Sequence, residues 1–352
     1  MQRCLILAKN GFGSTRPNPM VGSVIVCDDK IIGEGYTSPY GGNHAEVNAI
    51  ESVKNKSLLK KATIYVSLEP CSHQGKTPPC TELIIKSQLP KVVVGIIDDN
   101  SLVSGKGITR LRQNGCDVMV GVLENECKEI NKRFFTFHNK KRPYIILKWA
   151  ETKDGFIAPV YPFKPEEKIH VSDNRKPVWI SNHVCQQLVH KWRSEEESVL
   201  VGTNTVIRDN PKLNVRKWTG NNPIRLVLDN SLRIPHKFNV FDGSVKTIVF
   251  TSSKTMFEKE KENIILEYID YSKSIPQQIC DTLYEYEIQS IIVEGGAQIL
   301  QSFIYDNLWD EARIFIGNTI FKKGLNAPKI KGVLTSIEEI DSDILKIMHP
   351  AI

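Results

Sequence analysis

Short apolar runs alternate with amphipathic segments along the first part of the chain. Val21–Val26 and Ile31–Tyr36 are predicted strands on either side of a turn at Asp28–Lys30, which together indicate a hairpin. Further strands are predicted at Thr63–Leu68, Val92–Ile97 and Asp117–Val122, and helices at His44–Val53, Thr81–Lys86, Ile108–Gln113 and Glu124–Phe137. This order predicts a sandwich of helices around a mixed sheet.

A basic, polar stretch, Asn139–Pro143, interrupts this pattern, and the alternation restarts beyond it. Strands are then predicted at Tyr144–Trp149, Ser198–Val201, Ile224–Leu228, Thr247–Phe250 and Ser290–Val293, with a helix at His183–Trp192. Strands alternating with helices predict a mostly parallel sheet with a ligand site at the strand ends. Pro159–Asn174 carries three prolines and several charges, and we expect a surface insertion there. With 352 residues the chain is too long for most single cores, so we expect two α/β domains, residues 1–142 and 143–352.

Composition narrows the class of protein without naming a function. The hydrophobic content of 41% and the charged content of 24% are ordinary for a soluble globular protein. The net charge of +6 is mild, and no run of five basic residues is present, so an anionic small molecule suits it at least as well as a nucleic acid. There is no signal-peptide pattern and no apolar run long enough to span a bilayer. The eight cysteines lack a regular spacing, which indicates reduced thiols and a cytoplasmic location.

Four residues indicate a catalytic zinc site. His44 opens a predicted helix, and Cys71 and Cys80 follow a predicted strand, separated from each other by Ser72–Pro79. Three N and S ligands leave the fourth tetrahedral position open for water, which distinguishes catalytic from structural zinc. Glu46, two residues after His44, is placed to move protons on and off that water. The set is the known signature of zinc nucleobase deaminases, except that their two cysteines are separated by only two residues.

Two less specific interpretations of these residues remain open. A cysteine pair in a cytosolic protein is usually structural or inert, and a lone histidine usually fills an ordinary surface or core role. A structural zinc site is the second interpretation, with His73 as its fourth ligand. It would leave Glu46 without a purpose.

Longer motifs around these residues resemble a known family. They are Pro17-Asn18-Pro19-Met20-Val21-Gly22, His44-Ala45-Glu46, Glu69-Pro70-Cys71 followed by the loop to Cys80 with its Gly-Lys-Thr-Pro-Pro ending, and Asp98–Gly107. They resemble the bifunctional riboflavin-biosynthesis deaminase/reductase family, and the long loop between the cysteines separates that family from cytidine and tRNA-adenosine deaminases. In the last motif Asp99 and Ser101 replace two prolines that are usual in the family. Family members usually carry a few more residues ahead of the first helix.

The resemblance implies a cytidine-deaminase-like α/β/α sandwich and a specific substrate. That substrate is a diaminopyrimidinone carrying a ribosylamino 5-phosphate, which is hydrolysed at its 2-amino group. Asn18 would orient the ring, and His73 and Lys76 would face the sugar phosphate. A basic loop beside a zinc site suits an anionic substrate, although a solvated loop lysine is the alternative for Lys76.

The second part of the chain gives weaker signals from its residues alone. Gly202 and the pair Gly295-Gly296 each follow an apolar strand, where glycine lets backbone N–H groups approach a phosphate. Neither belongs to a G-x-G-x-x-G motif, and glycines after strands are also common turn residues. Nucleotide binding and an ordinary turn therefore both remain open.

Motifs from Arg142–Lys148 to Val293–Gly296 recur in the order of the reductase domain of the same family, which is dihydrofolate-reductase-like. This resemblance implies hydride transfer from NADPH to the ribosyl C1′. The residues implied for the dinucleotide are Ala150, Trp179, Thr205, Asp209, Asn230, Gly295 and Gly296. The residues implied for the substrate are Lys148, Arg193, Leu213, Arg216 and Glu294, with the arginines facing its phosphate. Lys148 and Glu294 are the candidates for polarising or protonating the sugar oxygen.

Simpler roles compete with these assignments. Trp179 and Leu213 could be core residues, and Lys148, Arg193 and Arg216 could be surface charges. For the whole chain, one alternative is a zinc deaminase of nucleic acid or free nucleosides with a non-catalytic C-terminal domain. Another is a zinc-stabilised binding module. We expect a phosphorylated pyrimidine as the substrate, zinc and NADPH as cofactors, no nucleic-acid or membrane partner, and a homo-oligomer as the family implies.

Overall fold

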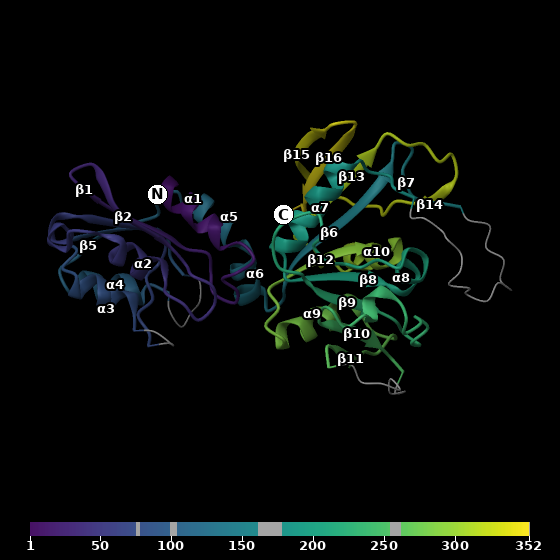
Figure 1. Ribbon diagram of the computed structural model, residues 1–352, viewed down its shortest axis with the longest axis horizontal. Helices are drawn as coiled ribbons and strands as arrows, with labels where there is room; N and C mark the ends of the chain where they lie inside the picture. Colours follow the sequence, from purple (N-terminus) through teal and green to yellow (C-terminus); the bar gives the residue numbers. More distant parts are fainter. Residues whose placement is uncertain (75–77, 99–103, 161–177, 254–261, 352) are drawn as a thin grey trace. The chain divides into compact units, whose positions relative to one another are not determined.

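The computed structural model describes residues 1–74, 78–98, 104–160, 178–253 and 262–351. The chain divides into two compact units, Met1–Arg142 and Pro143–Ile352 (Figure 1). None of the described helices combines the length and the apolar character that crossing a bilayer requires.

The first unit is built on one mixed, five-stranded sheet in the order β2-β1-β3-β4-β5. Its strands are β1 (Gly22–Cys27), β2 (Lys30–Tyr36), β3 (Thr63–Leu68), β4 (Lys91–Ile96) and β5 (Asp117–Val120). Its helices are α1 (Gln2–Ala8), α2 (Ala45–Ser52), α3 (Cys80–Lys86), α4 (Lys106–Gln113), α5 (Glu124–Ile130) and α6 (Lys132–Lys140), with 3₁₀ turns at Lys9–Gly11 and Lys56–Lys61. Strand β1 is antiparallel to β2 and β3, whereas β3, β4 and β5 are parallel. The predicted sandwich around a mixed sheet is confirmed.

Alternating side chains of β1 place helices on both faces of this sheet. Ile25 and Cys27 belong to the core that α2, α3 and α4 cover, while Val24 packs with Cys4 and Leu7 of α1. The two layers of helices are visible on opposite sides of the sheet, with α5 beside α1 (Figure 1). A strand with apolar residues on both faces is expected to be buried on both sides.

The predicted β1–β2 hairpin is confirmed. Asp28 and Asp29 connect the strands with φ values of 49° and 57°. Positive φ at both central residues is the signature of a type I′ turn, whose twist suits a two-residue hairpin, and aspartate tolerates it better than most residues.

The predicted single helix over Glu124–Phe137 is wrong, because Asn131 divides it into α5 and α6. Asn131 is buried and has φ −106° and ψ 17°, outside the helical range. Its side chain accepts a hydrogen bond from the Met20 N–H at 2.8 Å and donates one to the Met20 carbonyl at 3.0 Å. These two bonds to one backbone residue hold Asn131 in place outside the helical conformation, so α5 ends and α6 begins there.

The second unit is built on a nine-stranded sheet in the order β11-β10-β9-β8-β12-β6-β13-β16-β15. Its strands are β6 (Tyr144–Thr152), β8 (Ser198–Gly202), β9 (Ile224–Leu228), β10 (Thr247–Thr251), β11 (Ile264–Tyr268), β12 (Ser290–Gly295), β13 (Glu311–Gly317), β15 (Val333–Ile340) and β16 (Asp343–His349). The short strands β7 (Phe156–Pro159) and β14 (Gly324–Asn326) form a separate pair. The helices are α7 (His183–Glu195), α8 (Thr203–Asp209), α9 (Ile275–Glu285) and α10 (Ala297–Tyr305), with a 3₁₀ turn at Asn239–Phe241.

In this sheet, all neighbouring strands from β11 through β10, β9, β8, β12 and β6 to β13 are parallel. The two pairs that involve β16, with β13 and with β15, are antiparallel. Alternate residues of β6 enter two different cores, Ile145 and Leu147 with α9 and α10, and Ile146 with α7. The mostly parallel sheet is therefore as predicted, and helices cover both of its faces. This arrangement brings the carboxyl ends of β6, β12, β8 and β9 to one edge of the sheet.

The hydrophobic pattern did not predict the antiparallel hairpin β15–β16. Strand β15 forms the edge of the sheet and exposes Val333, Leu334 and Ile337 among its glutamates, so no alternation marks a buried face. Of the predicted surface insertion, Pro159 ends β7 and pairs with Gly324, and Val160 is exposed. Residues 161–174 lie outside the described part of the chain.

Candidate active sites

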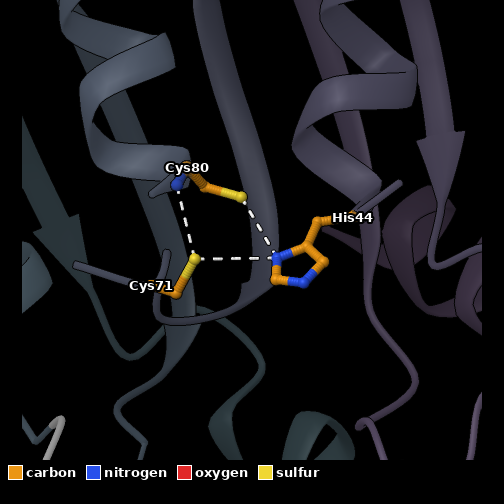
Figure 2. Close-up of side chains that lie close together, drawn as sticks. All are labelled: His44, Cys71 and Cys80. Carbon is orange, nitrogen blue, oxygen red and sulfur yellow. Dashed lines mark hydrogen bonds between the residues drawn. The ribbon is translucent and has the colours of Figure 1, made fainter. Parts of the chain in front are cut away.

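Three predicted zinc ligands converge at one point of the first unit (Figure 2). His44 is the N-cap of α2, Cys71 lies in the loop after β3, and Cys80 is the first residue of α3. The Nδ1 atom of His44 lies 3.6 Å from the sulfur of Cys71 and 3.3 Å from that of Cys80. All three donor atoms lie within 4.8 Å of one another.

This geometry fits a zinc ion. Zinc binds thiolate sulfur at about 2.3 Å and imidazole nitrogen at about 2.0–2.1 Å in a tetrahedron, so a shared ion needs N and S about 3.5 Å apart. The measured 3.3 and 3.6 Å bracket that separation. Among the described residues His73 does not join the cluster, so the structural site with His73 as fourth ligand finds no support. Three protein ligands are the number that a catalytic zinc site uses.

The surroundings of Cys71 favour the thiolate that metal binding requires. A hydrogen bond from the Cys80 thiol, together with His44 and the Cys80 backbone N–H at 3.3 Å, lowers the pKa of Cys71 below its ordinary value. The same interaction raises the pKa of Cys80, which acts as the donor of the pair. Coordination to a metal would deprotonate both thiols.

Glu46 lies in the first turn of α2, next to the cluster, and is 4% exposed. Burial, together with the negative charge of Cys71, raises the pKa of Glu46 to about 7. A carboxyl group that titrates near neutral pH can both accept and donate a proton during one reaction cycle.

Two glycines of β2 set the position of α2 and therefore of His44 and Glu46. A side chain at Gly35 would meet the Ala49 nitrogen at 2.4 Å and the Ala45 oxygen at 2.5 Å. A side chain at Gly33 would meet the Ala49 oxygen at 2.5 Å. Only glycine allows the helix to lie this close to the strand.

Glu69 holds the other side of the site, and the sequence analysis did not single it out. This buried carboxylate accepts backbone N–H groups from Asp98 at 3.2 Å, Gly105 at 3.0 Å, Gly107 at 2.8 Å and Ile108 at 3.2 Å. It therefore ties the start of α4 to the loop that carries Cys71. Its place directly before Pro70-Cys71 was the signal that could have identified it.

The structure describes only some of the residues that are expected to hold the pyrimidine ribotide. Asn18 is half-buried in the loop before β1, where its backbone N–H donates to the Thr15 carbonyl at 3.0 Å. His73 is exposed, two residues after Cys71. Lys76 lies outside the described residues, as do residues 99–103 of the Asp98–Gly107 motif. A hollow of about 470 Å³ borders this loop and is lined by Ser72, Ser104, Gly105, Lys106, Thr109, Arg110 and Gln113.

The second unit contains a cavity of about 1010 Å³ at the carboxyl ends of its parallel strands. Every residue implied for the dinucleotide or for the reductase substrate lies on its wall: Lys148, Ala150, Trp179, Arg193, Thr205, Asp209, Leu213, Arg216, Asn230, Glu294, Gly295 and Gly296. Its volume is at the upper end of the range for small-molecule sites, which suits two ligands side by side.

Helices α8 and α10 both begin at this cavity, directly after Gly202 and Gly296. A side chain at Gly202 would meet the tip of the Ile299 side chain of α10 at 2.6 Å, so Ile299 would have to shift to make room for it. The first N–H groups of a helix and its dipole favour an anion. The wall therefore offers two helix starts to the phosphates of a dinucleotide, and NADPH fits the residues present.

A buried ion pair lies at another part of the wall. Arg193 of α7 donates from Nε and Nη2 to the two carboxylate oxygens of Glu294, at 2.7 and 2.6 Å. Burial alone would raise the pKa of Glu294, but Arg193 and Lys148 bring it down to about 2. For Arg193 the alternative of a surface charge is therefore wrong, because its side chain is only 11% exposed.

Lys148 of β6 is half-buried near this pair. Burial lowers the pKa of its ammonium group, Glu294 opposes that shift and Arg193 adds to it. The Nζ atom also lies 5.9 Å from the centre of the Phe315 ring.

The exposed fractions of Trp179 and Leu213 show whether these two wall residues are core residues. Trp179 is 58% exposed, so the core alternative is wrong for it. Leu213 is 2% exposed and packs in the core as well as lining the cavity. Sequence reasoning missed His190, a buried cavity residue three positions before Arg193 on α7. The helical spacing from Arg193 could have identified it.

Two family models match separate parts of the chain. Residues 1–96 match the model of the cytidine and deoxycytidylate deaminase zinc-binding region, and residues 143–344 match that of the RibD C-terminal domain. The riboflavin biosynthesis protein RibD of Aquifex aeolicus is 40% identical over 96% of this chain and 91% of its own length. That of Synechocystis is 39% identical over 95% of this chain and 87% of its own length.

Two solved structures are similar to this chain over nearly its whole length. A diaminohydroxyphosphoribosylaminopyrimidine deaminase/5-amino-6-(5-phosphoribosylamino)uracil reductase from Thermotoga maritima is 39% identical and has a TM-score of 0.86, over 100% of this chain and 97% of its own. RibD of Acinetobacter baumannii is 31% identical and also has a TM-score of 0.86, over 99% of this chain and 97% of its own.

Proposed function

Because the chain belongs to the bifunctional riboflavin-biosynthesis deaminase/reductase family, we propose that its two units act on one pyrimidine ribotide in succession. The first unit would hydrolyse the 2-amino group of 2,5-diamino-6-(ribosylamino)-4(3H)-pyrimidinone 5′-phosphate. The second unit would reduce the ribosyl group of the deaminated product to a ribityl chain with NADPH. The observation that carries the proposal is the buried Glu46 beside His44, Cys71 and Cys80, in one chain with the reductase cavity.

In the first unit the three ligands would hold zinc and Glu46 would carry the protons. Zinc, when bound, lowers the pKa of a coordinated water to about 7, which makes a nucleophile available at neutral pH. Glu46 would accept a proton from the attacking water on its carboxylate and pass it to a ring nitrogen. It would then accept the second proton of the same oxygen and give it to the amine that departs as ammonia. Its burial beside the three ligands supports this role, because burial raises the pKa of the carboxyl group and favours its protonated form.

Asn18, His73 and Lys76 complete the proposed substrate contacts of the first unit. Asn18 would orient the pyrimidine ring, and the two basic residues would face the phosphate. The hollow beside the Cys71 loop supports an anionic substrate, because Lys106 contributes a positive charge to its wall, whereas the charge of Arg110 is paired with Glu82.

In the second unit the cavity would hold dinucleotide and substrate together. NADPH, when bound, supplies the hydride that is delivered to C1′ of the ribosyl group. We assign Ala150, Trp179, Thr205, Asp209, Asn230, Gly295 and Gly296 to the dinucleotide. We assign Lys148, Arg193, Leu213, Arg216 and Glu294 to the substrate.

Lys148 is the proton donor that we propose for the sugar oxygen. Its lowered pKa makes the ammonium group a better acid than an exposed lysine. Glu294 cannot take this part at neutral pH, because Arg193 keeps it ionised. Glu294 instead fixes the Arg193 guanidinium and adds a negative charge that attracts the Lys148 ammonium.

The test is to identify the products of the purified, zinc-loaded full chain. With the diaminopyrimidine ribotide alone we expect ammonia and a deaminated ribotide by mass spectrometry. With NADPH added we expect the deaminated product carrying two further hydrogens. Absence of ammonia would refute the first step, and a deaminated product that resists reduction would refute the second.

A further inference from the structure

The substrate end of the reductase cavity contains fewer free cationic donors than the sequence indicates. Both Nε and Nη2 of Arg193 are engaged by Glu294, and Nη1 donates to the Asn214 carbonyl at 3.5 Å. Three of the five N–H donors of this guanidinium are therefore engaged, which leaves one on Nη1 and one on Nη2 for a phosphate. A phosphate with three acceptor oxygens therefore has room for further donors from this wall.

His190 is such a donor. It lies on α7 three residues before Arg193, is 3% exposed and lines the same cavity. Its Nδ1 atom accepts the backbone N–H of Arg216 at 3.3 Å. Because a backbone N–H can only donate, Nδ1 must carry a lone pair, and the proton of the neutral ring is on Nε2.

The charged neighbours of His190 keep the ring neutral. Burial, together with Arg193 and Arg216, lowers its pKa to about 4, with Lys217 acting in the same direction and Glu294 against it. Near neutral pH the ring is therefore fixed in the tautomer that has Nε2–H as its donor.

Within the described part of the chain, no residue hydrogen-bonds to Nε2 of His190. The two ring nitrogens point in different directions, so Nε2 is directed away from the Arg216 backbone that Nδ1 contacts. An N–H donor without a partner on a cavity wall is suited to an oxygen acceptor of a ligand.

We propose that His190 is a further substrate-binding residue of the reductase, whose Nε2–H donates a hydrogen bond to a phosphate oxygen of the ribotide beside Arg216. The proposal rests on the proposed function of the second unit. It assigns two tasks to one ring: Nδ1 positions the backbone of Arg216, and Nε2 binds the phosphate.

Two substitutions separate these tasks. His190→Asn can keep an acceptor near the position of Nδ1 but has no donor at the position of Nε2. His190→Gln places an amide N–H near the position of Nε2 but lacks the acceptor. Both variants are neutral and polar, so they differ mainly in which of the two contacts survives.

The experiment measures NADPH oxidation by the zinc-loaded full chain with the deaminated ribotide and with its phosphate-free nucleoside. For His190→Asn we expect the KM for the ribotide to rise about 10- to 100-fold, the range for a lost hydrogen bond to a charged group. We expect kcat and the KM for the nucleoside to change less than about 2-fold, because neither involves the phosphate. His190→Gln should bring the KM for the ribotide back to within a few-fold of the unmodified chain.

Measurements on the unmodified chain distinguish failure of the proposed function of the second unit from failure of the role of His190. If it does not oxidise NADPH with the ribotide, the proposed function of the second unit fails. If it does, the role of His190 is overturned by any of three results: an unchanged KM in His190→Asn, an equal loss for ribotide and nucleoside, or equal losses in both variants. Calorimetric titration of both variants with the ribotide in the presence of NADP⁺ checks the same affinities without turnover.

Discussion

Glu46 of the first unit and Glu294 of the second are both buried glutamates at a candidate active site, yet their environments move their pKa values in opposite directions. Burial and the Cys71 charge raise the pKa of Glu46 to about 7. Burial acts on Glu294 as well, but the bidentate Arg193 and nearby Lys148 bring its pKa to about 2. The charged partner, and not the degree of burial, therefore decides which carboxyl carries protons and which remains a fixed charge.

The two sites also differ in how many parts of the chain build them. The zinc cluster needs three side chains whose donor atoms lie within 4.8 Å, so each one is indispensable. The reductase cavity takes its wall from segments between Lys148 and Leu325, and the loss of one contact leaves many others. Loss of a zinc ligand should therefore disable the first site, whereas loss of a single binding contact should only weaken the second.

The largest effect is expected for Glu46→Gln. Ammonia release should fall by at least about 10³-fold, because the amide cannot accept the proton, while His44 and both cysteines still hold zinc. Ammonia is measured enzymatically and zinc by elemental analysis. Reduction of the deaminated ribotide by the same preparation is the control and should be unchanged. Normal ammonia release in this variant would remove Glu46 from the mechanism.

Lys148→Met should reduce kcat for the ribotide reduction by about 10²- to 10⁴-fold, the usual contribution of a positioned acid. Lys148→Arg is the matched control, since it keeps the positive charge but donates a proton poorly. For Lys148→Arg, NADPH absorbance should give a KM close to that of the unmodified chain and a kcat that remains low. A normal kcat in Lys148→Arg would show that a positive charge alone is sufficient at this position.

Glu294→Gln should lower the free energy of unfolding of the second unit by about 3 kcal/mol, because it leaves the Arg193 charge buried without its counter-ion. Chemical denaturation followed by tryptophan fluorescence measures this change. Glu285→Gln on the exposed face of α9 is the matched control and should change stability by less than about 0.5 kcal/mol. Equal stability of both variants would contradict the role given to the ion pair.

The stability that the same ion pair contributes should depend on pH, and this is the smallest effect that we predict. The folded-state pKa of Glu294, about 2, lies below its ordinary value of 4.5, so ionisation favours the folded state. The stabilisation is complete above pH about 4.5 and is lost as the pH falls towards about 2. The difference in stability between the unmodified chain and Glu294→Gln should shrink over that interval. A difference that stays constant would exclude Glu294 as its source.

Hydrophobic patterning and short motifs were sufficient to predict many of the strands and the zinc-site residues of this protein. Buried strands such as β3 and β9 were predicted because their apolar runs are bounded by turn residues. His44, Glu46, Cys71 and Cys80 were predicted because metal chemistry restricts both residue type and spacing. The cavity residues of the second unit were predicted through family motifs, since single lysines and arginines carry no such restriction.

What the sequence did not reveal depends on contacts between distant segments. Asn131 ends a helix because it binds the backbone of Met20, and Glu69 reaches N–H groups near the start of α4. His190 becomes a directional donor only because the Arg216 backbone fixes its tautomer. Each of these polar side chains would be unremarkable in an isolated segment, and folding supplies the partner that defines its role.

The central claim is that deamination in the first unit must precede reduction in the second. It is tested most directly by NADPH absorbance with the full chain, on the diamino ribotide and on the deaminated ribotide, each with and without a zinc chelator. We predict that the chelator abolishes oxidation with the diamino ribotide and leaves oxidation with the deaminated ribotide unchanged. Equal oxidation of NADPH with the diamino ribotide in the presence of the chelator would contradict the account.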